Sequence, residues 1–163
     1  EINLAVSLYL YKLLENFNIN VIMTRNTSDG LYGISTKNYK KRDMQKRKDI
    51  IKAINPDIVV SVHMNSYVRH NLRGAQVFYV SNNSYNKHLA EVIQSELNSF
   101  TNTNRKIKEM RGKYMYDRLN PIGVLVECGF LSNYFDRTNL LNEGYVKKLS
   151  LKITQGVINY FYS

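Results

Sequence analysis

The sequence lacks several features that would assign it to a membrane or to a particular cellular compartment. It contains one cysteine in 163 residues, which excludes an internal disulfide and leaves the redox compartment undecided. No apolar run approaches the roughly 18 residues of a membrane-spanning helix, so no transmembrane segment is predicted. An initiator methionine and a basic leader with an apolar core are also missing, and the chain opens inside a predicted helix. We therefore expect it to be processed or truncated at its N-terminus.

Acidic residues are scarce relative to basic ones. The chain has 13 Asp and Glu against 23 Lys and Arg, which gives a net charge of +10. This excess predicts attraction to anionic partners. Nucleic acid is the usual partner of this kind, and an anionic cell-wall polymer rich in peptide carboxylates fits the charge equally well. The same two readings apply to residues 101–118, where basic side chains alternate with tyrosines.

A second basic cluster covers residues 37–49. A solvated helix face explains it most simply, and the functional alternative is a rim that attracts an anionic polymer. Its seven basic residues are Lys37, Lys40, Lys41, Arg42, Lys46, Arg47 and Lys48.

The alternation of strand and helix patterns predicts one α/β domain over residues 1–163, with a mainly parallel central sheet and helices on both faces. Hydrophobic residues make up 44% of the chain and charged residues 22%, and there are no repeats or linkers. The expected strands cover residues 19–24, 58–62, 74–80 and 122–126. The expected helices cover residues 1–17, 41–54, 135–142 and 143–161, with one more after a turn at residues 81–84.

Two continuous apolar runs each end on a side chain that can bind a metal ion or transfer a proton. Residues 58–62 precede His63, and residues 122–126 precede Glu127. Such runs are typical of central parallel strands that are buried on both faces. Ligands in open α/β sheets bind beyond the carboxyl ends of the strands, so both side chains are expected at one edge. Together they predict a metal site, a general acid–base pair, or both. The structural alternative is that the two side chains have no function beyond the fold, the histidine being hydrogen-bonded and the glutamate salt-bridged at the strand ends.

The segments around these residues also resemble a known family. They are Ser61-Val62-His63-Met64-Asn65 and Val126-Glu127-Cys128-Gly129-Phe130-Leu131-Ser132-Asn133. Both are similar to the signature segments of the zinc-dependent N-acetylmuramoyl-L-alanine amidases, the peptidoglycan-cleaving amidase 3 family. Further matches follow in order, at Ile2-Asn3-Leu4-Ala5, Thr24-Arg25 with Asp29, Arg47, and Gly74-Ala75-Gln76-Val77-Phe78-Tyr79. The resemblance runs from residue 2 to about residue 160, and residues 88–94 are most similar to sporulation and spore-cortex members.

The resemblance implies both a reaction and a setting. The fold would be the phosphorylase/hydrolase-like α/β fold of the family, and the cofactor would be Zn²⁺. His63 would be one zinc ligand and Glu127 the catalytic carboxylate. Asn65 would bind substrate or hold the loop after His63. The substrate would be peptidoglycan and not nucleic acid, cleaved between N-acetylmuramic acid and L-alanine. The location would be extracytoplasmic, in the cell wall or spore cortex of a bacterium, and a separate regulatory protein is compatible with the sequence although no motif shows one.

The sequence departs from the family pattern at its start. The first strand with its Asp-Pro-Gly-His-Gly loop is not found, so the sheet is expected to lack that strand and the domain to be incomplete at its N-terminus. In the family, the other two zinc ligands are a His on that first strand and a Glu that opens the first helix. This Glu stands four residues before the Asn of Asn-Leu. Glu1 stands two residues before Asn3, so we do not assign it as a ligand.

The other candidate ligands and nucleophiles have structural explanations. His70 falls in a predicted loop, and His88 is expected on a helix surface. Cys128 neighbours Glu127 on a strand and should point to the opposite face, where it packs as a small apolar residue. Asp43 and Asp57 fit a helix and a turn. The chain is therefore expected to supply one zinc ligand of three and to bind zinc poorly.

Two other functions remain open from the sequence. One is a peptidoglycan-binding domain without activity, and the other is a basic nucleic-acid module. The second would bind a phosphate backbone and weaken steeply with salt.

Overall fold

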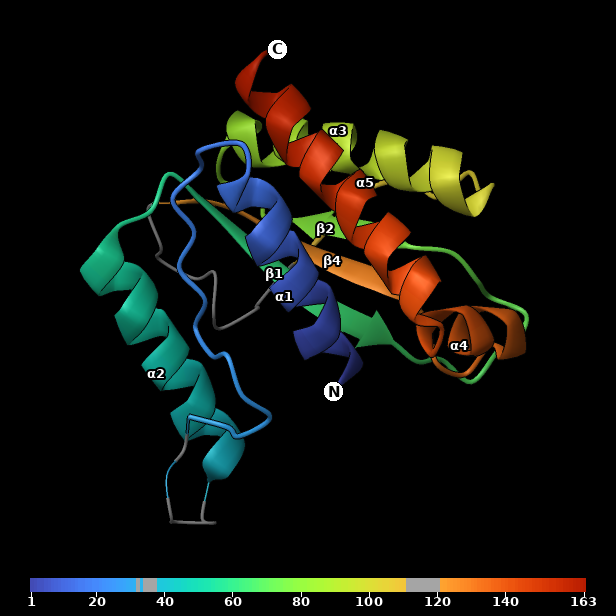
Figure 1. Cartoon of the computed structure of the whole chain (residues 1–163), viewed down its shortest axis with the longest axis horizontal. Helices are drawn as coiled ribbons and strands as arrows, with labels where there is room; N and C mark the ends of the chain where they lie inside the picture. Colours follow the sequence, from blue (N-terminus) through green and yellow to red (C-terminus); the bar gives the residue numbers. More distant parts are fainter. Residues whose placement is uncertain (32, 34–37, 111–120) are drawn as a thin grey trace.

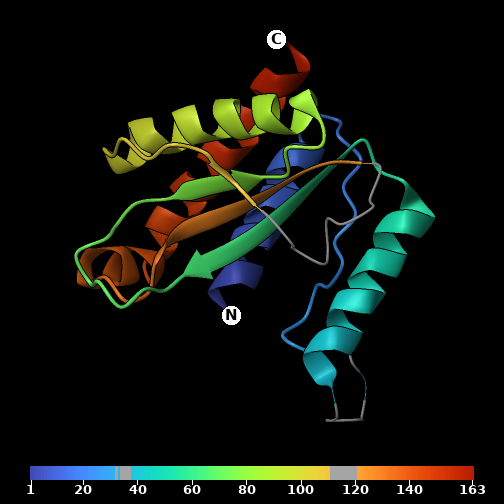
Figure 2. The ribbon, with the colours of Figure 1, turned by 180° about the vertical axis from the view of Figure 1, so that it is seen from behind.

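A mixed four-stranded sheet with helices on both faces forms the centre of the molecule (Figures 1 and 2). The computed structural model describes residues 1–31, 33, 38–110 and 121–163. The strands are β1 (Ile58–Asn65), β2 (Gln76–Tyr79), β3 (Lys108–Glu109) and β4 (Ile122–Phe130). The helices are α1 (Ile2–Glu15), α2 (Tyr39–Ile54), α3 (Ser84–Thr101), α4 (Tyr134–Leu140) and α5 (Glu143–Phe161). The predicted α/β class is confirmed. The predicted alternation is not, because the observed order is α1, α2, β1, β2, α3, β3, β4, α4, α5.

The strand order is β1-β4-β2-β3. β1 and β4 are parallel, in register from Ile58 opposite Ile122 to His63 opposite Glu127. β2 runs antiparallel to β4, and the short β3 runs parallel to β2. The sheet is thus mostly parallel, as expected, and its long apolar strands β1 and β4 lie side by side.

The two faces of the sheet are covered unequally. Helices α1, α3 and α5 pack on one face, where Val60, Val62, Val124 and Val126 join the main core (Figure 1). On the other face α2 contributes to a much smaller cluster built on Ile51, Met110 and Leu125. Figure 2 shows the strands from this side, with α2 standing beside them. Because neighbouring strand residues point to opposite faces, each apolar run serves both clusters, and this explains why it is continuous.

The strand predicted for residues 19–24 is wrong. The segment belongs to no strand and ends in a bend at Thr24. Its burial still alternates, since Ile19, Val21 and Met23 are half-buried while Asn20 and Ile22 are exposed. The alternating pattern correctly indicates a segment with one covered side. A strand also needs a hydrogen-bonding neighbour, and none of the described strands bonds to this segment.

Two apolar residues at the C-terminal ends of helices are exposed. Ile54 and Phe161 lie in the last turns of α2 and α5, where the helices extend past the sheet. The Asn83 side chain caps α3 by accepting a hydrogen bond from the Tyr85 backbone N–H. In the described part of the chain, no helix is both long and apolar enough to cross a membrane.

A glycine sets the separation between α3 and α5. Gly156 is buried on α5, and a Cβ atom built on it would lie 2.6 Å from Ile93 Cα and 3.1 Å from Ile93 N. These are backbone atoms of α3, which cannot move aside as a flexible side-chain end can. The close approach of the two helices therefore requires a residue without a side chain at position 156.

We expect Gly156→Ala to destabilise the protein. Overpacking typically costs about 1–3 kcal/mol, which exceeds the roughly 1 kcal/mol that alanine gains over glycine in a helix. Urea unfolding followed by circular dichroism measures the change. The matched control is Gly144→Ala on the same helix, where the new Cβ meets only the Asn142 side chain at 3.2 Å. A Gly156→Ala variant as stable as the control would contradict the close packing.

Candidate active site

His63 and Glu127 lie next to each other on adjacent parallel strands. They are register partners in the pairing of β1 with β4, and paired positions on adjacent strands are about 5 Å apart and point to the same face. Their neighbours Val62 and Val126 belong to the main core, so His63 and Glu127 point to the opposite face, which α2 covers in part. The His63 residue is exposed and Glu127 is half-buried. The structure thus brings together the two side chains that the sequence placed at one edge.

Gln76 extends this row across the sheet. It is the register partner of Glu127 on the antiparallel strand β2, and its side-chain amide donates to the Lys106 backbone oxygen at 2.8 Å. The sequence showed Gln76 only as part of a family-like strand. Its place beside Glu127 depends on β4 lying between β1 and β2, which sequence spacing does not reveal.

The segment after Glu127 holds the loop after His63. Three hydrogen bonds join the two chain segments where they leave the sheet. They are Leu131 N to Asn65 O (2.8 Å), Tyr67 N to Ser132 Oγ (3.0 Å) and Asn133 Nδ2 to His70 O (2.7 Å). The end of the family-like segment therefore acts as a support for the loop that follows His63.

Asn65 takes part in this support. Its side-chain oxygen accepts from the Ser66 backbone N–H at 2.8 Å, while its backbone oxygen accepts from Leu131. Asn65 was expected either to bind substrate or to hold the loop after His63, and these contacts show that it holds the loop. Contact with substrate stays a prediction.

Asp136 is a buried residue that links two chain segments by hydrogen bonds, and the sequence pattern did not single it out. Its Oδ2 accepts from the Gly74 N–H at 2.8 Å and from the Phe130 N–H at 2.9 Å, so it joins the approach to β2 to the end of β4. Its own backbone N–H donates to Asn133 Oδ1 at 3.1 Å, which caps α4. The spacing Asn133-x-x-Asp136 before a helix resembles a capping pattern and could have indicated the residue.

A network around Arg47 fastens α2 to the preceding segment. Arg47 Nε lies 2.6 Å from Asp43 Oδ2, and Arg47 Nη1 donates to Thr24 Oγ1 at 2.7 Å. The Leu31 backbone N–H donates to Asp43 Oδ1 at 2.7 Å. Partial burial by itself raises the pKa of Asp43, but the hydrogen bonds from Arg47 and Leu31 and the charge of Arg47 outweigh it, and the pKa lies below its usual value. The structural explanation of Asp43 is confirmed, and the residues of the Thr24 and Arg47 matches meet here.

The alternative histidines and the cysteine lie elsewhere. Cys128 is buried in the main core, where burial above all, and the nearby Glu127 charge, raise the pKa of its thiol; its prediction as a packing residue is confirmed. His88 Nε2 lies 2.7 Å from Ser163 Oγ, and His88 shares a pocket with Ile58 and Ile122 at the starts of β1 and β4. It is therefore at the opposite end of the strands from His63. His70 is exposed in the loop between β1 and β2.

His63 and Glu127 fit a zinc site in the type of donor. Zn²⁺ accepts imidazole nitrogen and carboxylate oxygen, and a catalytic site combines three protein ligands with an open position. Among residues 1–31, 33, 38–110 and 121–163, no group of three or more His, Cys, Asp or Glu is placed to hold a metal ion. The described residues thus offer suitable donors at the expected place, but fewer than a full set.

The basic cluster on α2 divides into two parts. Lys40, Lys41, Arg42 and Lys46 are exposed, whereas Arg47 is in the Asp43 network and Lys48 is buried. The exposed part is on the helix that shares a sheet face with His63. Lys37 lies outside the described residues, as does the 111–118 part of the basic segment predicted for residues 101–118.

Comparison with known proteins gives a consistent picture. The model of the N-acetylmuramoyl-L-alanine amidase family matches residues 1–159. The germination-specific N-acetylmuramoyl-L-alanine amidase of Bacillus subtilis (strain 168) is 32% identical over 165 residues, which span 99% of this chain and 70% of that relative. The solved structure of the CwlD amidase from Clostridioides difficile, in complex with the GerS lipoprotein, has a TM-score of 0.95 and 34% identity, over 99% of this chain and 85% of that chain. The catalytic domain of CwlV from Bacillus (Paenibacillus) polymyxa shares the fold, with a TM-score of 0.83 at 21% identity over 99% of this chain and 83% of that chain.

The Asp43 network predicts a pH-dependent stability. A carboxyl group with a lowered pKa contributes stability above its unfolded pKa, and this contribution is lost as the pH falls through the folded pKa. Asp43→Asn should cost on the order of 1 kcal/mol at pH 7, because the amide can still accept from Leu31 but loses the charge beside Arg47. Below the ordinary pKa of about 3.8, the difference from the wild type should shrink.

Chemical denaturation between pH 7 and pH 3 measures this difference. Asp49→Asn on the same helix is the control, because Asp49 is exposed and bonds only to Gln45 among the described contacts. A difference for Asp43→Asn that stays constant over this range would show that the carboxylate charge is not what stabilises α2.

Proposed function

Because the chain belongs to the N-acetylmuramoyl-L-alanine amidase family, we propose that it hydrolyses the amide bond between N-acetylmuramic acid and the L-alanine of the peptidoglycan stem peptide. The observation that carries this proposal is the register pairing of His63 with Glu127 at the carboxyl ends of β1 and β4. The similarity to a germination-specific amidase supports a place of action outside the cytoplasm, in the cell wall and more narrowly in the spore cortex.

We propose Zn²⁺ as the cofactor, with His63 as one of its ligands. Imidazole nitrogen is a common zinc ligand, and the neighbouring carboxylate is of the type found beside catalytic zinc. When bound, zinc polarises the scissile carbonyl and lowers the pKa of the attacking water. The choice of zinc is supported by the family resemblance and the donor chemistry.

Glu127 supplies the proton transfer in this proposal. Its carboxylate accepts a proton from the attacking water, whose hydroxide forms the new bond to the lactyl carbonyl carbon. The same carboxyl group then gives the proton to the alanine nitrogen as the carbon–nitrogen bond breaks. The products are a free lactyl carboxylate and a peptide with a free amino group. β4 and the register with β1 hold Glu127 in a fixed place for both transfers.

The exposed basic residues of α2 suit the polymer substrate. Stem peptides carry carboxylates, and positive charge along an approach path raises the local concentration of an anionic substrate. Lys40, Lys41 and Arg42 are exposed in the first turns of α2, on the sheet face of His63 and Glu127. This placement supports the rim interpretation over a purely solvated helix face.

A partner protein is a further part of the proposal. The amidase from Clostridioides difficile was solved in complex with a lipoprotein, and its similarity covers 99% of this chain and 85% of that chain. We propose that this chain also binds a separate protein, which regulates it. The second candidate function, a peptidoglycan-binding domain without activity, is favoured by the incomplete set of metal donors among the described residues.

Glu127→Gln should stop hydrolysis while leaving binding intact. Glutamine keeps the size and hydrogen bonding of the side chain but cannot accept the proton, which typically costs about 10²- to 10⁴-fold in rate. Affinity for peptidoglycan should change little, because the lost interaction belongs to the transition state. Release of stem peptide from purified peptidoglycan, with zinc supplied, is measured beside sedimentation with the same polymer.

The matched control is Glu91→Gln, which changes an exposed glutamate on α3. Full activity of Glu127→Gln would remove Glu127 from the mechanism. A wild-type chain that binds peptidoglycan but releases no peptide would favour the non-catalytic alternative.

Zinc should bind weakly to this chain, through His63. Metal affinity depends on several ligands held in place together, and the described residues provide fewer than three. We expect the dialysed protein to contain much less than one zinc per chain. His63→Ala should lower this content further, whereas His88→Ala, at the other end of the strands, should not. Elemental analysis measures the zinc content of each variant. Near-stoichiometric zinc in the wild type would show that residues other than His63 also bind the metal.

A further inference from the structure

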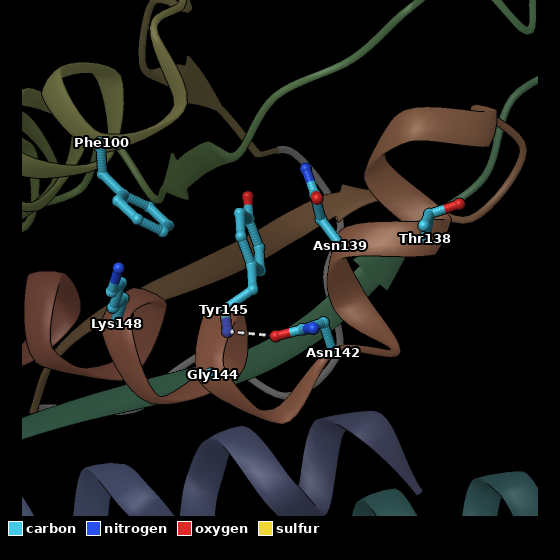
Figure 3. A pocket seen from close by; sticks show the side chains of 7 residues that line it. All are labelled: Phe100, Thr138, Asn139, Asn142, Gly144, Tyr145 and Lys148. Carbon is cyan, nitrogen blue, oxygen red and sulfur yellow. Dashed lines mark hydrogen bonds between the residues drawn. The ribbon is translucent and has the colours of Figure 1, made fainter.

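A pocket of about 460 Å³ lies on the far side of the sheet from the candidate active site (Figure 3). It is formed where the end of α3 meets α4 and the start of α5. Its two aromatic residues, Phe100 and Tyr145, pack against the main core, whereas His63 and Glu127 point away from that core. The lining residues are Phe100, Thr138, Asn139, Asn142, Gly144, Tyr145 and Lys148.

The aromatic residues form an ordered apolar wall. The rings of Phe100 and Tyr145 have centroids 4.9 Å apart at an angle of 39°. Figure 3 shows the Tyr145 ring standing between Phe100 and Asn139. Burial above all, and the charge of Asp136, raise the pKa of Tyr145 to about 12. Its hydroxyl therefore keeps its proton near neutral pH and can donate a hydrogen bond.

Polar side chains with unused bonding capacity surround this wall. Thr138, Asn139, the Tyr145 hydroxyl and Lys148 make no side-chain hydrogen bond or ion pair within the described part of the chain. Their neighbours differ, since Lys147 is paired with Glu143 at 2.9 Å and the Asn142 side chain accepts from the Tyr145 N–H at 3.0 Å. The pocket thus combines an apolar wall, neutral donors and acceptors, and one positive charge that no described carboxylate neutralises.

We propose that this pocket binds an N-acetylated amino sugar that carries a carboxylate, as part of a peptidoglycan glycan strand. The apolar face of the sugar and its acetamido methyl group would lie against Phe100 and Tyr145. Thr138 and Asn139 would bond to hydroxyl and amide groups, and Lys148 would bind the carboxylate. The volume falls within the range of roughly 300–1,000 Å³ that is usual for small-molecule sites. The identity of the ligand rests on the proposed function.

The carboxylate requirement links the pocket to the product of the reaction. An intact muramic acid residue carries its lactyl group as an amide, and hydrolysis of that amide frees the carboxylate. The pocket would therefore prefer glycan from which the stem peptide has been removed. A second contact to the same polymer raises the effective concentration of the remaining amide bonds at the active site. The enzyme would stay on a strand that it has begun to process.

A titration of ¹⁵N-labelled protein with N-acetylmuramic acid tests the pocket directly. We expect shifts in the backbone amide signals of Gly144, Tyr145 and Lys148, and weaker binding of N-acetylglucosamine, which lacks the carboxylate. Lys148→Gln should weaken binding of N-acetylmuramic acid on the order of fivefold, as expected for one exposed charge contact. Lys147→Gln, which removes the adjacent and already paired lysine, is the matched control and should bind as the wild type does.

Tyr145→Phe provides a second variant that keeps the ring and removes only the hydroxyl, and it should also weaken binding. Equal affinities of Lys148→Gln, Tyr145→Phe and the control, or shifts confined to residues outside the pocket, would overturn the inference. The failure of the proposed function gives a different result. If the wild type releases no stem peptide but binds N-acetylmuramic acid through Lys148, the pocket is supported and the amidase activity is not.

Discussion

The pairing of β1 with β4 fixes the core and the chemistry of this protein at the same time. Each strand is apolar on both faces, so its backbone bonds are buried and must be satisfied by a neighbouring strand. The register that results places Val62 beside Val126 in the main core and His63 beside Glu127 on the opposite face. A shift of one residue in this register would separate the imidazole from the carboxylate and would disturb the core as well. Selection for a stable core and selection for the site therefore act on the same pairing.

At the edge of the sheet where His63 and Glu127 lie, polar groups join distant segments of the chain by hydrogen bonds. Asp136 bonds two backbone amides from distant segments, and Ser132 and Asn133 bond the loop that follows β1. Buried acceptors of this kind leave donors unsatisfied if they are removed, which costs more than the bond itself contributes. The long family-like segment from Val126 to Asn133 thus has two tasks. It contributes one carboxylate to the site, and it holds the neighbouring loop in position.

The unequal covering of the sheet divides the molecule into two functional sides. Helices α1, α3 and α5 cover one face, and the pocket beside Phe100 and Tyr145 lies where α3 meets α4 and α5. On the other face, α2 is the helix that the described residues place there, and it is fastened by Arg47, Asp43 and Thr24 as well as by a small apolar cluster. In the functions proposed above, the excess of basic residues acts on both sides, by attracting an acidic polymer along α2 and by binding it at Lys148.

The sequence alone determined the elements that depend on local pattern. The apolar runs predicted β1 and β4, the helical spacing predicted α1, α3 and α5, and the family-like segments pointed to His63 and Glu127. These features follow from the period of burial and from neighbours along the chain. Only the tertiary structure decided the features that depend on contacts between distant segments. Residues 19–24 have the alternation of a strand but no described strand as a partner, and Gln76 lies beside Glu127 only because β4 separates β1 from β2. Likewise Asp136 binds amides about 60 residues apart, and Lys148 differs from Lys147 only in the direction that α5 gives it. Spacing in a sequence encodes which face a residue occupies, but which group it meets there is fixed by the packing of the whole chain.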